Sequence, residues 1–450
     1  MQRMFAPVLR LEIGAGMTAE HRELLSAGLQ LEDERDIFEV PGLFALRDLI
    51  ELARLDRPAL RDPVHQPVDH PLLSSSRSVF RAIREAGQLL LQHPYVSFAS
   101  SVEHFLREAA SDPKVVTIKM TLYRTASRGS IVDSLLEAVG NGKHVSVVME
   151  LRARFDEAAN IRLAELMEEA GIHVTYGVVG SRIHCKALLV VRQEADRLRR
   201  YVHIGTGNYH SETARSYCDL GLLTCDETIA QDIGELFNYL TTGFTPWRKY
   251  QAVLPAPGLM KKALLTRIWR EAELQSARRG GLIRFKVNAL LDHDIVKALY
   301  AASRAGVRIE LYVRDSCRLI AGVPGLSDNI RVVSTVGRFL EHARIYHFGN
   351  GGSDQYFISS ADAMKRNLEE WVEILCPVSA PPLVAKLNEI FDCHRADRRY
   401  SWEMQPDGSY LQRRPAKGTA DEGLHQVMIS RVEARLGESI SRAEKMRRRG

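Results

Sequence analysis

Apolar and polar residues alternate along the chain with two periods, one typical of strands and one typical of helices. Short apolar runs rich in β-branched residues, such as Val115–Tyr123 and Val145–Leu151, predict strands. Ile131–Val139 and Asn160–Ala170 carry apolar residues at helical spacing and predict helices. Because strands and helices alternate, the pattern predicts an α/β fold with a mostly parallel sheet covered by helices.

The second half of the chain repeats this order. A helix is predicted at Asp294–Ala305, and a strand follows it as in the first half. Arg154 precedes His184 by 30 positions (184 − 154), and Arg314 precedes His342 by 28 (342 − 314). The matched order indicates duplication of one domain. Two unrelated α/β domains, with histidines placed alike by chance, are the alternative.

The two ends of the chain do not follow the repeat. Val8–Ile13 predicts a strand, and Thr18–Ala27 predicts a helix that begins at a threonine cap. His425–Met446 predicts an exposed amphipathic helix, and we prefer a solvated tail to a nucleic-acid-binding arm. The expected regions are residues 1–68, a partial domain; 69–251, the first α/β domain; 252–411, the second α/β domain; and 412–450, a charged tail, helical or disordered.

Composition narrows the class of protein without identifying a partner. The 450 residues are 45% apolar and 26% charged, which suits ordinary packed domains. The six cysteines form no CxxC pair and no evident disulfide framework, and no run is long and apolar enough to predict a transmembrane helix. A net charge of +5 favours polyanions slightly, but it does not separate nucleic acid, a phosphate polymer, a membrane surface or no anionic partner.

Two segments place a histidine two residues before a cation. His184 precedes Lys186, and the turn Gly205–Asn208 follows; His342 precedes Arg344, and Ser359–Asp362 follows. Side chains alternate along a strand, so each histidine is expected to point the same way as its cation. A neutral imidazole can attack phosphorus while the cation neutralises the transferring phosphoryl group. A satisfied core histidine is the alternative for either segment alone.

Arginines at predicted strand ends suggest an anion-binding pocket. Arg124, Arg152 and Arg154 each follow a predicted strand, where ligand sites of α/β proteins form. A guanidinium group matches two phosphate oxygens at once. For any one of these arginines, a surface ion pair is the alternative.

The paired histidine segments resemble the phospholipase D superfamily, and longer stretches resemble type 1 polyphosphate kinase over residues 5 to 411. The resembling stretches are Lys119–Arg124, Glu150–Asn160, Arg182–Leu188, Tyr201–Tyr209, Leu340–Tyr346, Ser359–Asp362 and Lys365–Asn367. The resemblance implies two tandem phospholipase D-like α/β domains, which are duplicates and carry the catalysis. It also implies that a partial α+β remnant of a head domain precedes them.

The resemblance also implies roles for individual residues. His184 would become the phosphohistidine, and His342 would be a second catalytic histidine close to the nucleotide. The other expected site residues are Tyr217 and Arg314 for ATP, Arg124 and Arg154 for the magnesium and phosphate pocket, and Lys186, Asn208 and Arg344 as supporting residues. Arginines have no acceptor atom, so Mg²⁺ would be held mainly by phosphate oxygens and water.

The implied activity is reversible transfer of the γ-phosphate of ATP to a growing polyphosphate chain. The implied partners are ATP or ADP, inorganic polyphosphate, Mg²⁺ and further copies of the chain, with no nucleic acid. The implied location is the cytoplasm, including its membrane periphery.

Two departures from the family pattern leave other functions open. The resemblance places the start of the chain within the head domain, and we expect no counterpart of the family's N-terminal domain in it. Trp371 stands where the family usually has an arginine, and restoring that arginine is expected to raise activity or ATP affinity. The alternatives are a catalytically weakened relative that binds polyphosphate or nucleotide, and a phosphodiesterase of the phospholipase D type.

Overall fold

The computed structural model describes residues 8–42, 46–73, 78–122, 129–150, 157–195, 197–243, 249–418 and 422–447. The chain divides into two compact units, residues 1–64 and 65–450.

The first unit is a small α+β element. Its elements are β1 (Leu11–Gly14), α1 (Ala19–Leu29), α2 (Asp33–Asp36), β2 (Ile37–Val40), a 3₁₀ turn at Leu46–Leu49, α3 (Ile50–Arg54) and a second 3₁₀ turn at Pro58–Leu60. Strands β1 and β2 pair in parallel. Helix α1 begins after Thr18, whose side chain accepts a hydrogen bond from the backbone N–H of His21, so the predicted cap is confirmed. The predicted first strand is shorter than expected.

The first α/β domain occupies the start of the second unit. Its elements are α4 (Val79–Ala86), β3 (Gln88–His93), a π-helical turn at Ala99–Glu103, α5 (His104–Ser111), β4 (Val115–Leu122), α6 (Ser130–Gly140), β5 (His144–Met149), α7 (Glu157–Glu169), β6 (His173–Thr175), β7 (Arg182–Ile183), β8 (Lys186–Gln193), β9 (Leu198–Gly205), a 3₁₀ turn at Thr213–Arg215, β10 (Tyr217–Thr224) and α8 (Glu227–Thr242).

The second α/β domain follows with the same order of strands. Its elements are β11 (Leu254–Ala256), α9 (Met260–Ser276), β12 (Leu282–Val287), α10 (His293–Arg304), β13 (Arg308–Val313), β14 (Ile330–Thr335), β15 (Leu340–Glu341), β16 (Arg344–Phe348), a 3₁₀ turn at Asn350–Gly352, β17 (Gln355–Ser359), a π-helical turn at Arg366–Glu370, β18 (Trp371–Val378), α11 (Pro381–Ala396), β19 (Ser401–Met404) and β20 (Tyr410–Gln412). Helix α12 (Leu424–Arg447) comes last.

Both domains build a mixed sheet, so the expectation of a mostly parallel sheet is wrong. Strands β4, β5 and β6 run parallel, whereas β8, β9, β10 and β3 continue the sheet antiparallel. Strands β8 and β9 are joined by the short stretch between Gln193 and Leu198, and such a short link can connect only antiparallel neighbours. The second sheet repeats this arrangement with β12, β13 and β14 parallel and β16, β17, β18 and β11 antiparallel. The shared order confirms that the two domains are copies of one fold.

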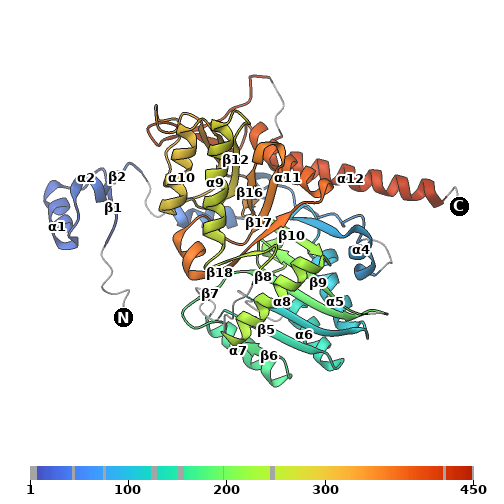
Figure 1. Ribbon diagram of the computed structural model, residues 1–450. Helices are drawn as coiled ribbons and strands as arrows, with labels where there is room; N and C mark the ends of the chain where they lie inside the picture. Colours follow the sequence, from blue (N-terminus) through green and yellow to red (C-terminus); the bar gives the residue numbers. More distant parts are fainter. Residues whose placement is uncertain are drawn as a thin grey trace. The chain divides into compact units, whose positions relative to one another are not determined.

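Each domain lends a short strand to the sheet of the other. Strand β7 of the first domain pairs in parallel with β18 of the second, and β15 of the second pairs in parallel with β10 of the first. Figure 1 shows β7 beside β18 where the two domains meet. Because these two strands directly precede His184 and His342, the exchange brings both histidine segments to the boundary between the domains.

The hydrophobic core is shared across this boundary. Neighbouring residues of the second sheet point to opposite faces, so Ile345 and Ile358 join the core of the first domain. Tyr346 and Phe357, one position away, pack instead into a separate core that includes residues of α9 and α10. The two domains therefore pack against each other through a core that includes residues of both.

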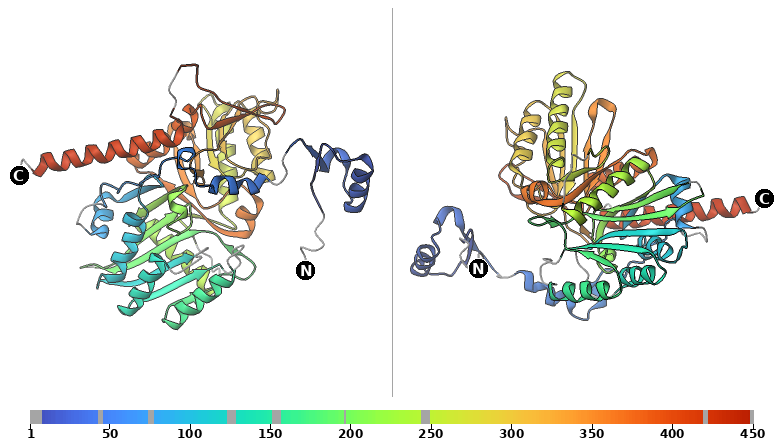
Figure 2. Two further views of the ribbon diagram at one scale, coloured as in Figure 1. Left: turned by 180° about the vertical axis from the view of Figure 1, so that it is seen from behind. Right: turned by 60° about the horizontal axis from the view of Figure 1, so that its bottom comes forward.

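Helix α12 forms over the residues where the sequence predicts a helix. The expectation that it is exposed is wrong for its first turns, because Leu424, His425, Met428 and Ile429 are buried. The two views in Figure 2 show its C-terminal half extending beyond the sheets of the second unit. Among the described helices, none combines the length and the apolar character needed to cross a membrane.

Candidate active site

Both predicted histidines lie at a break between two strands, not within one strand as expected. His184 and Cys185 separate β7 from β8, and their backbone N–H groups both donate to the carbonyl oxygen of Val372, at 3.0 and 2.9 Å. His342 and Ala343 separate β15 from β16 in the same way, donating to the carbonyl of Cys218 at 3.2 and 2.7 Å. The break arises because the chain leaves one sheet and enters the other at this point.

Each histidine is held by a carboxylate of the opposite domain. The Nδ1 atom of His184 lies 2.7 Å from an oxygen of Glu373, and Nδ1 of His342 lies 2.8 and 2.9 Å from the two oxygens of Asp219. A carboxylate accepts hydrogen bonds, so each ring carries its proton on Nδ1 and its lone pair on Nε2. The two side chains are 14% and 17% exposed, which leaves them within reach of a substrate.

The two carboxylates are fixed by matching hydroxyl groups. Thr206 donates its hydroxyl hydrogen to Asp219 at 2.6 Å, and Ser360 donates its own to Glu373. The amide of Asn367 donates a further hydrogen bond to Glu373 at 2.6 Å. With these bonds in place, the carboxylates can orient the imidazoles without rotating themselves.

Sequence reasoning missed Asp219 and Glu373 as site residues. The signal was present as a spacing, since Asp219 follows Thr206 by 13 positions (219 − 206) and Glu373 follows Ser360 by 13 (373 − 360). An acidic residue at the same distance after both turns could have been read as a duplicated histidine partner.

Burial keeps both imidazoles neutral. It lowers the pKa of His184 below its ordinary value, although the neighbouring carboxylate of Glu373 acts in the opposite direction. Burial and then the charge of Arg344 lower the pKa of His342 to about 4. Both rings therefore hold an unprotonated Nε2 at neutral pH, as a nucleophile or a proton acceptor requires.

The two predicted cations are buried next to their histidines. Burial lowers the pKa of Lys186 to about 8, and the charge of Arg344 adds to this effect. Arg344 donates from Nη2 and Nε to the two oxygens of Asp362, at 2.9 and 3.2 Å, and its Nη1 lies 3.1 Å from Nε2 of His342. The charge of Arg344 acts on both histidines, so the two segments form one electrostatic centre.

Asn208 and Asp362 occupy equivalent places with different bonding. Asp362 pairs with Arg344 and accepts hydrogen bonds from the backbone and side chain of Asn288. The buried Oδ1 atom of Asn208 has no hydrogen-bond partner among the described residues. A buried acceptor without a partner is costly in an isolated protein, which fits a site completed by a bound ligand.

The residues expected to contact ATP gather at the second histidine. The ring of Tyr217 lies 5.3 Å from that of His342, measured between centroids, at an angle of 60°. Arg314 donates from Nε to the backbone carbonyl of Glu341 at 2.9 Å and to Asn288 at 3.2 Å. The expected pocket residues Arg124 and Arg154 lie outside the described residues.

Trp371 lies against the first histidine. Its ring centroid is 5.2 Å from that of His184. The guanidinium carbons of Arg182 and Arg366 lie 5.7 and 5.1 Å from the indole centroid, within the range of a cation–π contact. The position without the family's usual arginine is therefore flanked by two other arginines.

The described residues suit a metal that arrives with a nucleotide. The carboxylates of Asp219, Glu373 and Asp362 already accept hydrogen bonds from imidazole, hydroxyl and guanidinium groups. Magnesium retains water readily and binds phosphate oxygens. The expected Mg²⁺ therefore fits here when phosphate oxygens and water hold it.

Comparison with known proteins gives a consistent result for the whole second unit. Residues 78–246 match the polyphosphate kinase C-terminal domain 1, and residues 253–422 match the polyphosphate kinase C-terminal domain 2. Polyphosphate kinase from Thermosynechococcus vestitus is 44% identical over 458 residues, covering 96% of this chain. Polyphosphate kinase from Mycolicibacterium paratuberculosis is 47% identical over 412 residues, covering 91%.

A solved structure agrees with the sequence matches. The crystal structure of polyphosphate kinase from Porphyromonas gingivalis superposes with a TM-score of 0.82 at 31% identity, covering 95% of this chain and 65% of that one. The chain spans 62% and 56% of the length of the two relatives named above. The expected pair of tandem α/β domains is confirmed, and each of the two matches one C-terminal domain of polyphosphate kinase.

Proposed function

Because the chain belongs to the polyphosphate kinase family, we propose that it transfers the γ-phosphate of ATP reversibly to inorganic polyphosphate through a phosphohistidine at His184. One observation carries the proposal: each of two histidines at the domain boundary is fixed through Nδ1 by a carboxylate of the other domain, which directs the reactivity to Nε2. The second histidine, His342, is influenced by the same Arg344 charge as His184, and such a pair suits a transfer in two steps.

In the first step, the Nε2 lone pair of His184 attacks the γ-phosphorus. The bond between that phosphorus and the β,γ-bridging oxygen breaks, and ADP leaves with the electron pair. The ring becomes positively charged when Nε2 is phosphorylated while Nδ1 keeps its proton. The carboxylate of Glu373, 2.7 Å from Nδ1, offsets this charge.

In the second step, a terminal oxygen of the polyphosphate chain attacks the phosphohistidine. The N–P bond breaks, the new phosphoanhydride bond forms, and the neutral imidazole returns. Lys186 and Arg344 stabilise the negative charge on the transferring group, and Mg²⁺, when bound, neutralises the nucleotide phosphates. His342 serves as a hydrogen-bond acceptor or base, because its pKa of about 4 leaves Nε2 unprotonated.

Tyr217 and Arg314 complete the nucleotide side of the site. We assign the tyrosine ring to the adenine base and the guanidinium group to the phosphates, since both lie next to the second histidine. Arg124 and Arg154 are assigned to phosphate binding through the family resemblance. We propose further that the protein is cytoplasmic and assembles with further copies of itself. We expect it to bind no nucleic acid.

The test uses ATP labelled at the γ-phosphate, with Mg²⁺ and the purified chain. We expect an acid-labile, alkali-stable phosphoprotein together with long-chain polyphosphate on a gel. The matched control is His173→Gln, which replaces an exposed histidine outside the site and should label normally. Label without polymer would favour a binding relative that performs only half of the cycle, and hydrolysis of a phosphodiester would favour the phospholipase D alternative.

A further inference from the structure

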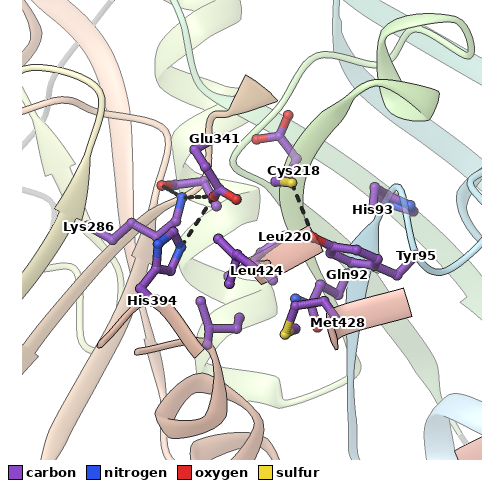
Figure 3. Close-up of a pocket in the computed structure, with 13 residues that line it drawn as sticks. Gln92, His93, Tyr95, Cys218, Leu220, Lys286, Glu341, His394, Leu424 and Met428 are labelled. Carbon is purple, nitrogen blue, oxygen red and sulfur yellow. Dashed lines mark hydrogen bonds and ion pairs between the residues drawn. The ribbon is translucent and has the colours of Figure 1, made fainter. Parts of the chain in front are cut away.

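Glu341, the residue directly before His342, is the centre of a buried charge cluster. Its Oε2 atom lies 2.8 Å from Nζ of Lys286 and 3.5 Å from Nε2 of His394, and its Oε1 atom lies 2.9 Å from Nε2 of His425. Figure 3 shows Lys286 and His394 converging on this carboxylate at one end of a small pocket. Three elements, β12, α11 and α12, thus hold one side chain on β15.

The backbone of Glu341 is tied to the proposed nucleotide site. Its carbonyl oxygen accepts the hydrogen bond from Nε of Arg314 at 2.9 Å. It also pairs with Cys218 across the β10–β15 ladder, one residue from the carboxylate of Asp219 that orients His342. A displacement of Glu341 would therefore move both a phosphate-binding guanidinium and the second histidine.

The hydrogen bonds of His425 fix its tautomer. The backbone N–H of Phe339 donates to Nδ1 at 3.2 Å, so Nδ1 is an acceptor and the neutral ring carries its proton on Nε2. That proton is donated to Glu341 at 2.9 Å. Cys218, Glu341 and His425 lie close enough together to be considered as three metal ligands. A metal ligand must offer a lone pair, however, and Nε2 of His425 carries the proton that it donates to Glu341, so we interpret the group as a hydrogen-bond network.

His425 lies in the first turn of helix α12, which is packed against the rest of the second unit. Leu424, Met428 and Ile429 are buried, and Leu424 and Met428 line the same pocket as Glu341 (Figure 3). The backbone N–H of Leu424 donates to the carboxylate of Asp397 at 2.8 Å. The imidazole is therefore fixed by the packing of its own helix, and it bonds the residues on either side of Leu340: Phe339, just before β15, and Glu341, within it.

We propose that His425 is a positioning residue, through which α12 holds β15 so that Arg314 and His342 keep the geometry needed for nucleotide binding. The effect on nucleotide binding rests on the proposed function, whereas the contact between α12 and β15 does not. Burial alone would raise the pKa of Glu341, yet Lys286 and the two histidines keep it well below its usual range, so the carboxylate stays charged and needs its donors.

Two variants separate the two hydrogen bonds of His425. In His425→Asn the amide oxygen can still accept from Phe339, but the shorter side chain cannot reach Glu341. In His425→Gln the amide nitrogen can still donate to Glu341, while the contact with Phe339 is lost. Met428→Ala is the packing control, because Met428 anchors the same helix without bonding to β15.

The readouts are hydrogen exchange over residues 338–346 and single-turnover phosphorylation at a series of ATP concentrations. We expect His425→Asn to raise exchange in this segment and to weaken the apparent ATP affinity by about 10-fold, since small misplacement of binding groups is costly. His425→Gln should stay within about 3-fold of the unaltered chain, because it keeps one charge-assisted bond. Met428→Ala should lower the thermal midpoint and leave ATP affinity unchanged.

Separate results decide the two proposals. Equal exchange over residues 338–346 in all variants would overturn the role of His425, whether or not the chain turns over ATP. Equal loss of stability in His425→Asn and His425→Gln, with unchanged ATP affinity, would also overturn it, since that pattern fits a purely structural contact. Absence of phosphohistidine in the unaltered chain would refute only the proposed function, because exchange still reports the hold on β15.

Discussion

In the first repeat the cation beside the histidine is Lys186, and the last residue of the turn is the neutral Asn208. In the second repeat the same positions hold Arg344 and Asp362, which form a bidentate ion pair. The second cation is thus fixed in place by a carboxylate, whereas the first donates to the backbone carbonyl of its own histidine. The two repeats thus share one arrangement but differ in how firmly the cation is fixed, which is the basis for the different roles that we propose for the two histidines.

The largest expected effect separates the two histidines. We expect His184→Gln to abolish the phosphoprotein, because it removes the Nε2 atom that we propose as the nucleophile. We expect His342→Gln to slow labelling by about 10²- to 10⁴-fold, as for loss of a general acid or base, without abolishing it. Rapid-quench labelling with γ-labelled ATP measures both rates.

Circular dichroism of the two glutamine variants serves as the folding control. Equal, complete loss in both variants would contradict the division of roles, and label on His184→Gln would remove this residue as the nucleophile.

Asp362→Asn is expected to damage stability more than any change at Asn208. It leaves Arg344 buried without its carboxylate, and breaking a buried pair costs about 3–5 kcal/mol. Urea unfolding monitored by fluorescence checks this expectation. A change below about 1 kcal/mol, the range of an exposed ion pair, would show that the pair does not anchor the second repeat.

Asn208→Asp is the reciprocal change in the first repeat. It introduces a carboxylate where the second repeat has one, so we expect Lys186 to pair with it and phosphorylation to slow by about 10-fold, the equivalent of one charged contact. Unfolding by urea should change little. An unaltered rate would mean that the difference between Asn208 and Asp362 has no bearing on chemistry.

The pH dependence should distinguish lysine from arginine. Lys186 is charged below its pKa of about 8 and neutral above it, because burial disfavours the ammonium form. We expect the phosphorylation rate to fall above pH 8, by about 10-fold at pH 9 if the charge is required. Lys186→Arg should remove this alkaline fall, since guanidinium stays charged.

The acidic side of the same profile is the internal control. Burial lowers the pKa of His184, so the neutral ring should persist below pH 6.5 in both proteins. An alkaline fall that is identical in Lys186→Arg would assign it to another group.

The sequence predicted elements whose cause is local. The strand over Val115–Leu122 and the helix over Ser130–Gly140 follow from the spacing of their own apolar residues. The mixed direction of the sheets was missed, because periodicity reports that a strand exists and not which neighbour it pairs with. Short links, such as those between Gln193 and Leu198 and between Phe348 and Gln355, indicate antiparallel hairpins.

The carboxylates that bond the two histidines were not predicted, because they are distant from them in sequence. Glu373 lies 189 positions from His184, and Asp219 lies 123 positions from His342. No local sequence pattern reveals contacts between residues so far apart. Both pairs form only because the two domains exchange short strands. The burial of His425 is of the same kind, since the helical pattern of α12 does not reveal what its first turn touches.

The smallest expected effect concerns Trp371, whose counterpart in the matching ladder of the other repeat is Tyr217. Each of the two rings lies beside the histidine of the opposite domain, but only Trp371 stands where the family usually has an arginine. Arg182 and Arg366 contact its indole ring, and each exposed cation–π contact contributes about 0.5–1 kcal/mol. We expect Trp371→Leu to weaken polyphosphate binding by about 5-fold at low salt, because both arginines lose the surface that orders them. Titration of polyphosphate into the protein, repeated at rising salt, measures this.

Trp371→Arg tests the ring and the charge at this position separately. It introduces the positive charge that the family usually has there and removes the indole ring. A third guanidinium group attracts phosphate, so the earlier expectation of higher activity or ATP affinity stands, but repulsion from Arg182 and Arg366 opposes it at low salt. We therefore expect a gain of no more than about 3-fold, and a steeper loss of polyphosphate affinity with salt than in the unaltered chain. If Trp371→Leu and Trp371→Arg bind polyphosphate equally and with the same salt dependence, then neither the ring nor the charge at this position bears on the substrate, and the two arginines act without it.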